Sequence, residues 1–213
     1  ILFFAVVASS CNKIDGLDQD TSFLNSIPAP STPSKIFDIS NDNSGMVKIT
    51  PLGEGISTFK VIFGHGTGTG ASAMVTPGSN VTHAYPEGTY SVTIVGKNIK
   101  GDSIVTSYPL SIVYRAPENL NVTLTQSGLN LKVNATADYA ASYLVYYGDV
   151  ANEVGTPLAK DGQVTHNYTT TGSYDVKVVA LSGGAAKSEK VTPITVTVPF
   201  GLPIDFESTS INY

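Results

Sequence analysis

Apolar and polar residues alternate with a period of two along most of the chain, which is typical of half-buried β-strands. Tyr90, Val92 and Ile94 fall on one face of such a strand, and the polar residues between them fall on the other. The same alternation recurs at residues 129–134 and 194–198. No apolar stripe with helical spacing continues beyond one turn. Because these short segments are separated by turns rich in Gly, Pro and Asn, the pattern predicts an all-β chain of antiparallel sandwiches.

The body of the chain also contains an internal repeat. Residues 81–85, Val-Thr-His-Ala-Tyr, recur at residues 164–168 as Val-Thr-His-Asn-Tyr, and the strand-like segment at 59–64 recurs at 143–148. The offset of 83 to 84 residues exceeds the period of solenoid repeats and matches the size of a small sandwich domain. We therefore predict two tandem immunoglobulin-like domains. Their predicted boundaries are residues 35–115 and 116–199.

The first eleven residues predict a lipid anchor. Residues 1–8 form an apolar run that is too short to span a bilayer but fits the hydrophobic region of a signal peptide, so we expect residues 1–10 to be the remnant of one. The segment Ala-Ser-Ser-Cys that ends at Cys11 resembles the lipobox of bacterial lipoproteins. That resemblance implies lipidation of Cys11, the only cysteine, and acyl chains anchor a soluble domain stably. The alternative is an ordinary signal peptide with an incidental cysteine.

Prolines predict linkers on both sides of the repeat. Residues 11–34 include three prolines between positions 28 and 33, which favour an extended, lipid-anchored, Pro-rich linker. Two more prolines, at positions 199 and 203, precede an apolar stretch. We expect residues 200–213 to be the start of a third domain that is truncated in this chain.

Composition narrows the range of partners. The chain is 41% apolar and can bury a core, whereas its net charge is −5 and Arg115 is the only arginine. Nucleic acid is not expected, because its phosphates are bound by clusters of Lys and Arg. A single cysteine gives no intrachain disulfide. Neither zinc-type Cys/His spacing nor a calcium loop is present in the sequence, so no metal or other cofactor is expected.

The repeat carries a family resemblance. Residues 82–92, Thr-His-Ala-Tyr-Pro-Glu-Gly-Thr-Tyr-Ser-Val, resemble the best-known motif of polycystic kidney disease (PKD) domains, H-x-Y, a turn ending in Gly, and Y-x-V; residues 165–176 resemble it equally. The family's upstream Trp-x-Phe-Gly-Asp-Gly element is matched only in part at 61–66 and 145–150, and the chain has no Trp. The resemblance implies a PKD-type immunoglobulin-like fold for both repeats and no particular ligand.

A lipoprotein with tandem PKD-like modules is also similar to the surface glycan-binding proteins of Bacteroidota polysaccharide-utilisation systems. That resemblance implies an outer-membrane lipoprotein at the cell surface, whose modules space and present a C-terminal domain that captures polysaccharide. An outer-membrane transporter complex is a further partner that it implies. The alternatives are the non-catalytic N-terminal modules of a secreted glycoside hydrolase, or an adhesion stalk.

Candidate catalytic groups each have a simpler structural explanation. His83 and His166 occupy equivalent positions and are interpreted as framework residues beside tight turns. His65 lies in a glycine-rich stretch, residues 64–70, which is interpreted as an inter-strand loop because no helix follows it to bind phosphate. No pair of carboxylates and no nucleophile elbow is evident. The sequence therefore predicts that this chain is not an enzyme.

The second repeat contains a dense aromatic group at Tyr139, Tyr143, Tyr146 and Tyr147. An exposed tyrosine offers a flat apolar face and a hydroxyl, which suits stacking against a sugar ring. Alternatively, alternating members of the group fill the core and the others lie on a sheet face. We take Tyr139 and Tyr146 as the candidate ligand-binding residues.

Overall fold

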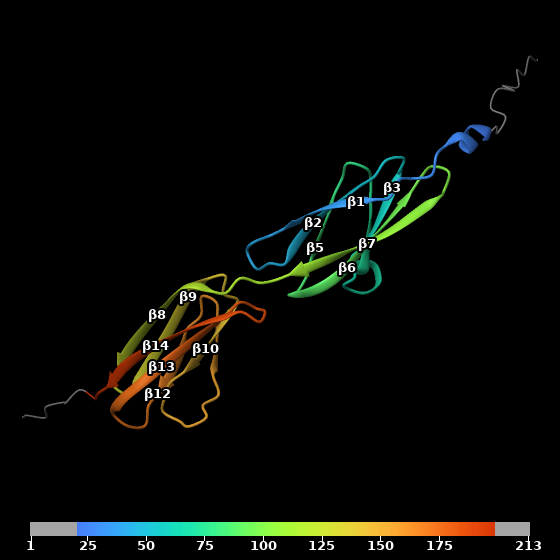
Figure 1. The fold of residues 1–213 in the computed structure, drawn as a ribbon. Helices are drawn as coiled ribbons and strands as arrows, with labels where there is room; N and C mark the ends of the chain where they lie inside the picture. Colours follow the sequence, from blue (N-terminus) through green and yellow to red (C-terminus); the bar gives the residue numbers. More distant parts are fainter. Residues whose placement is uncertain (1–20, 199–213) are drawn as a thin grey trace, which may run out of the picture.

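The computed structural model describes residues 21–198, which fold into two β-sandwiches joined end to end (Figure 1). The predicted fold class, all-β with tandem immunoglobulin-like antiparallel sandwiches, is confirmed. No helix within residues 21–198 is both long and apolar enough to cross a membrane. The predicted signal remnant at 1–10, Cys11 and the predicted third domain at 200–213 lie outside the described residues.

The first module, strands β1 to β7, has a three-stranded sheet of order β1-β2-β5 and a four-stranded sheet of order β4-β3-β6-β7. All of its strand pairs are antiparallel. The strands are β1 Ser34–Ile39, β2 Met46–Leu52, β3 Thr58–Ile62, β4 Ser72–Val75, β5 Val81–Ala84, β6 Gly88–Lys97 and β7 Ser103–Ile112. Two short 3-10 helices, η1 Ser22–Ser26 and η2 Gly68–Ala71, precede β1 and β4.

The second module, strands β8 to β14, repeats this arrangement strand by strand. Its sheets have the orders β12-β9-β8 and β11-β10-β13-β14, again with antiparallel pairs only. The strands are β8 Glu118–Ser127, β9 Asn130–Asp138, β10 Ser142–Tyr146, β11 Thr156–Ala159, β12 Val164–Asn167, β13 Gly172–Leu181 and β14 Lys187–Val196. The repeat in the sequence is thus a repeat of one sandwich topology.

Each sandwich has its own hydrophobic core, and the two cores share no residue. The period-two alternation places every second side chain of a strand inside, as Val92 and Ile94 of β6 and Val176 and Val178 of β13 show; all four are fully buried. Burying one such aliphatic side chain stabilises the fold by about 1.5–3 kcal/mol relative to leaving it exposed. The alternation therefore both defines the strands and supplies the energy that holds the two sheets of a sandwich together.

The proline-rich segment before β1 lies against the first module. Pro30 and Pro33 are buried. Ser31 exchanges hydrogen bonds with Glu54, through its backbone N–H to the Glu54 carbonyl at 3.1 Å and through its hydroxyl from the Glu54 N–H at 2.7 Å. The Tyr108 hydroxyl donates to the carbonyl of Pro33. The described part of the predicted linker at 11–34 is therefore attached along the module over its last residues.

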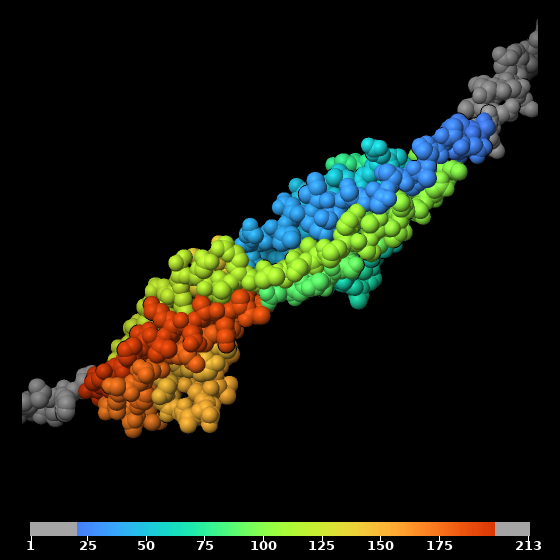
Figure 2. All heavy atoms as spheres, in the orientation of Figure 1, coloured from blue at the N-terminus to red at the C-terminus, as the bar shows by residue number. Residues whose placement is uncertain are grey.

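The chain enters and leaves the two-module body at opposite ends. The segment that carries η1 lies beyond the outer end of the first module, and β14 ends at the far end of the second (Figure 2). The junction between the modules lies in the middle, where β7 is followed after residues 113–117 by β8. The relative placement of the two ends therefore depends on this junction.

Candidate functional site

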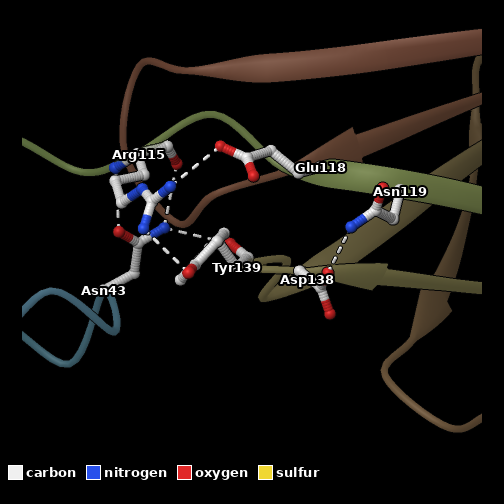
Figure 3. A network of polar contacts seen from close by, with 6 residues as sticks. All are labelled: Asn43, Arg115, Glu118, Asn119, Asp138 and Tyr139. Carbon is white, nitrogen blue, oxygen red and sulfur yellow. Dashed lines mark hydrogen bonds and ion pairs between the residues drawn. The ribbon is translucent and has the colours of Figure 1, made fainter.

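The most distinctive polar site joins the two modules, and we call it the joint. It comprises the connecting segment 113–117, the first-module loops 40–45 and 85–87, and the second-module loops 139–141 and 182–186. Asn43, on the first-module loop, points toward Arg115 and Tyr139 (Figure 3). Its side-chain amide donates to the carbonyls of Arg115 at 2.9 Å and Tyr139 at 3.0 Å, and its carbonyl accepts from the Arg115 N–H at 2.8 Å. One side chain of the first module thus binds both the connecting segment and the second module.

Local backbone geometry explains why asparagine suits this position. Asn43 has a φ of 60°, in the left-handed region that asparagine tolerates better than most residues. Tyr139, its partner across the joint, also has a positive φ, of 59°. The two loop conformations aim the Asn43 amide and the Tyr139 carbonyl at each other.

Arg115 adds a second set of contacts on the same side of the joint (Figure 3). Its guanidinium carbon lies 4.1 Å from the centroid of the Tyr139 ring, and one of its nitrogens donates to the Tyr139 hydroxyl at 2.8 Å. The other terminal nitrogen pairs with Glu118 at 3.0 Å. These groups are partly exposed, so each contact contributes modestly, and together they fix the direction of the connecting segment.

Glu87 forms the second bridge between the modules. Its carboxylate accepts from the backbone N–H of Tyr114 at 3.1 Å and from that of Ala185, in the β13–β14 turn, at 2.5 Å. The hydrogen bond from Ala185, followed by that from Tyr114, holds the pKa of Glu87 below its usual value. The Tyr114 hydroxyl in turn donates to the carbonyl of Tyr85 at 3.1 Å. Two separate loops of the first module therefore bind the second.

The two candidate ligand-binding tyrosines lie in different places. Tyr139 is part of the joint, where the Arg115 guanidinium lies over its ring. Tyr146 ends β10 on the outer face of its sheet, where Lys177 Nζ lies 4.5 Å from the ring centroid. An open hollow of about 450 Å³ adjoins Tyr146, lined also by residues of β13, β14 and the loop after β10. The two rings do not form one platform, and their role in ligand binding stays a prediction.

The other tyrosines of that aromatic group belong to the core. Tyr143 and Tyr147 are buried in the second module. For these two tyrosines the simpler alternative is therefore correct: they fill the core and do not bind a ligand on the surface.

The PKD-like motif forms one packed cluster in each module. In the first, the His83 ring stacks on Phe63 with centroids 4.1 Å apart and an interplanar angle of 12°. In the second, His166 stacks on Tyr147 at 4.0 Å and 10°. Each histidine also meets a polar partner from the loop after β3 or β10, namely His65 at 3.0 Å and Asp149 at 2.7 Å. Both histidines pack against aromatic rings of their module, which agrees with their interpretation as framework residues.

Two tyrosines complete each cluster. The buried hydroxyls of Tyr85 and Tyr168 donate to the carbonyls of Phe63 at 3.1 Å and Tyr147 at 3.0 Å. Burial raises the pKa of Tyr85 to about 12, with a smaller contribution from Tyr90, and burial likewise raises the pKa of Tyr168.

At the start of β6 and of β13, Tyr90 and Tyr174 donate to carbonyls four residues upstream, each at 3.0 Å. This is the tyrosine-corner arrangement of immunoglobulin-like sandwiches, and it ties the turn before the strand to the strand itself.

Sequence reasoning did not identify the joint residues Asn43 and Glu87. The Asn-Asp-Asn-Ser-Gly loop at 41–45 signals a turn, but it does not show that the turn faces another module. Among residues 21–198, no group of three or more His, Cys, Asp and Glu side chains is placed to hold a metal ion.

Comparison with known proteins gives structural similarity only. The PKD1 domain of the Vibrio cholerae metalloprotease PrtV is 24% identical, with a TM-score of 0.34 over 39% of this chain and 100% of that one. The PKD1 domain of Vibrio anguillarum Epp is 22% identical, with a TM-score of 0.33 over 40% and 98%. A two-domain fibronectin type III segment of chicken tenascin is 11% identical, with a TM-score of 0.44 over 79% and 100%. No protein-family model and no curated protein matches the sequence. At these values the similarities identify no activity or ligand for this chain.

Proposed function

We propose that the chain is a non-catalytic spacer, whose two modules form a stiff unit that separates a lipid anchor from a C-terminal glycan-binding domain. The joint is the observation that carries this proposal. Asn43 and Glu87 bind the second module from two different loops, and the connecting segment 113–117 is itself held by both. A connection of that length without such bonds would let the modules swing freely.

The dimensions suit a spacer. The longest strands have ten residues and rise about 3.3 Å per residue, so each module is roughly 33 Å long and the pair roughly 65 Å. Because the chain enters and leaves at opposite ends, most of this length separates whatever is attached to the two ends. A flexible linker whose fully extended length was also about 65 Å would hold its ends much closer together on average.

The cellular setting of the proposal rests on sequence resemblance. The lipobox-like segment at Cys11 supports an anchor in the outer membrane, and the resemblance to Bacteroidota surface proteins supports polysaccharide, and a transporter complex, as partners. Metabolic labelling with palmitate should mark the wild-type protein, and globomycin or the Cys11→Ser substitution should alter or remove the label. An unlabelled wild-type protein that fractionates as freely soluble would contradict the anchor.

Stiffness is the property that a spacer requires, and it can be measured directly. In a Cys11→Ser background, spin labels at the exposed positions Lys48 and Lys132 report the distance between the modules. We expect one narrow distance distribution, which should broaden in the Asn43→Ala, Glu87→Ala double variant. If the distance distribution of the wild type were as broad as that of the double variant, the proposal of a stiff spacer would be wrong.

The same proposal predicts that the two modules bind no glycan themselves. Affinity electrophoresis of residues 35–199 in gels that contain different polysaccharides should show no retardation. Retardation would transfer the binding function to the modules, and Tyr146 beside its hollow would then be the first residue to substitute.

A further inference from the structure

One pair of histidines in the first module has a geometry that packing does not require. His65 comes from the loop between β3 and η2, and His83 comes from β5 in the opposite sheet. His65 Nδ1 and His83 Nε2 lie 3.0 Å apart, and both residues are only partly buried. Neither residue is fully enclosed by the protein.

The second module has a different pair of residues at this place in the repeat. Asp149 stands at the position of His65, and its carboxylate bonds His166 Nε2 at 2.7 Å. That pair combines an anionic acceptor with a ring that can donate, which makes a strong charge-assisted bond. In the first module both partners are imidazoles, so one neutral ring must donate to the other. The first module therefore has a second ring nitrogen where the second module has a carboxylate, and the hydrogen bond between its two neutral rings is the weaker of the two.

The separation of the two nitrogens fits a chelated metal ion. With metal–imidazole bonds of about 2.0–2.1 Å, nitrogens 3.0 Å apart subtend an angle of roughly 94° at the ion. Adjacent ligands in a square-planar or tetragonal complex subtend about 90°, and those in a tetrahedral complex about 109°. The spacing therefore favours tetragonal ions such as Cu²⁺ and Ni²⁺ over tetrahedral Zn²⁺.

The surroundings allow both nitrogens to face one ion. His83 is held by its stack on Phe63 and by the edge of Tyr85, so it is a preorganised ligand. His65 is flanked by Gly64 and Gly66, both at positive φ, and its ring lies edge-on to Tyr90 with centroids 5.4 Å apart. For both nitrogen lone pairs to point at one ion and not at each other, the His65 ring must shift and turn, and its glycine-flanked loop supplies that freedom.

We propose that His65 and His83 form a two-imidazole chelate for a divalent transition-metal ion of the Cu²⁺ type. Cu²⁺ is the first-row divalent ion that nitrogen ligands bind most tightly, and water fills its remaining positions. The bound ion would connect the loop of one sheet to β5 of the other. It would therefore stabilise the first module, by an amount that grows with the logarithm of the free ion concentration once this exceeds the Kd.

The test is a Cu²⁺ titration of the full chain, with Cys11 alkylated to remove the thiol, followed by isothermal calorimetry and by amide NMR spectra. Paramagnetic Cu²⁺ should first broaden signals of residues 63–71 and 81–85. His65→Ala, which alters an exposed loop, should weaken this binding at least about tenfold. His166→Ala, the matched change in the second module, should leave it unchanged.

A second variant keeps the test decisive whatever the stability of the first. His65→Asp recreates the pair of the second module, and it should lower Cu²⁺ affinity while the dispersed NMR spectrum confirms the fold. The proposal is overturned if the wild type and His65→Ala bind Cu²⁺ equally. It is equally overturned if broadening begins around Asp149 and His166, or if no binding is detected.

Discussion

At the scale of single residues, the two buried tyrosine hydroxyls connect the sheets of each sandwich. Tyr85, which follows β5, reaches the carbonyl of Phe63, which follows β3 in the opposite sheet; Tyr168 and Tyr147 repeat this in the second module. A buried carbonyl that loses its donor keeps its desolvation penalty. These hydroxyls therefore matter more than the surface hydrogen bonds of the same strands.

We expect Tyr85→Phe to destabilise the first module by about 1–2 kcal/mol, because it removes this donor without changing the packing. Denaturant unfolding followed by NMR can separate the two modules. Tyr168→Phe should produce the matching loss in the second module only. A Tyr85→Phe protein with unchanged unfolding of the first module would show that the hydroxyl bond contributes nothing net.

His83 should make the first module sensitive to acid. Its burial, and then its proximity to His65, lower its pKa below 6.5 in the folded state. The unfolded chain therefore binds more protons as the pH falls below about 6.5, so stability decreases from there until the folded-state pKa is passed. Above that range the contribution is fully present.

The measurement is chemical unfolding of the first module between about pH 7.5 and about pH 5.5, with EDTA present to exclude metal. His83→Phe keeps an aromatic ring on Phe63 and removes the titration, so its stability should vary less over this range. A wild-type protein with the same slope as His83→Phe would refute the assignment.

At the scale of elements, the turns that follow β3 and β10 pass very close to the neighbouring strands. Gly64 and Gly148 have φ values of 68° and 77°, and a Cβ there would lie 2.4 Å from the Ser91 carbonyl oxygen and 2.7 Å from that of Asp175. Both oxygens belong to the long strand of the same sheet, β6 or β13. This close approach requires glycine in both repeats.

Gly64→Ala should therefore destabilise the first module by more than the roughly 1 kcal/mol that positive φ alone costs a residue with a Cβ. Gly78→Ala is the matched control, because Gly78 has a φ of 80° and nothing within 4 Å of the added Cβ. Thermal unfolding of the two variants compares strain alone with strain plus collision. Equal losses of stability would show that the strand moves aside freely.

The elements were largely predictable from the sequence, whereas their contacts were not. Alternation identifies β6, β9 and β14, because a strand with one buried face must repeat every second residue. It does not show that Pro30 and Pro33 pack on the first module, since that depends on where the edge of a folded sheet lies. It puts Tyr143 and Tyr146 on opposite faces of a strand, but only the placement of β10 in its sheet shows that the face of Tyr143 is the buried one.

At the scale of the whole molecule, the joint depends on residues far apart in the sequence. Asn43 and Tyr139 are separated by 96 positions, and Glu87 and Ala185 by 98. In the sequence, the connection between the modules is marked only by the short segment Arg115-Ala116-Pro117, which does not determine the angle between them. Three-dimensional placement of the loops was needed to identify the contacts that set it.

Acid should loosen this joint. The pKa of Glu87 is depressed in the folded state, so the carboxylate's contribution is present above the unfolded value near 4.5 and is lost as the pH falls through the folded-state pKa. Glu87→Gln, which lacks the charge, should imitate the acid state at neutral pH. Small-angle X-ray scattering or spin-label distances should show a wider range of module orientations in both cases.

Two comparisons control this prediction. Glu54→Gln alters a carboxylate of the first module whose backbone, not its side chain, makes the bonds to Ser31, and it should leave the distances unchanged. Glu87→Gln should also leave the unfolding of each isolated core unaltered. If Glu87→Gln and wild type gave identical distributions at neutral pH, the bridge through Glu87 would not set the orientation.

The far end of the second module lacks the features that lock the first. Where the first module has the six-residue loop 40–45, the second has only Gly128 and Leu129 between β8 and β9, and Thr171 stands at the place of Glu87. This end instead carries the pair Asn130 and Asn167, whose side chains bond each other at 2.8 Å and not another module. Within residues 21–198 the two ends of the second module therefore differ: one is bonded to its neighbour through Tyr139 and Ala185, and the other has no counterpart of Asn43 or Glu87.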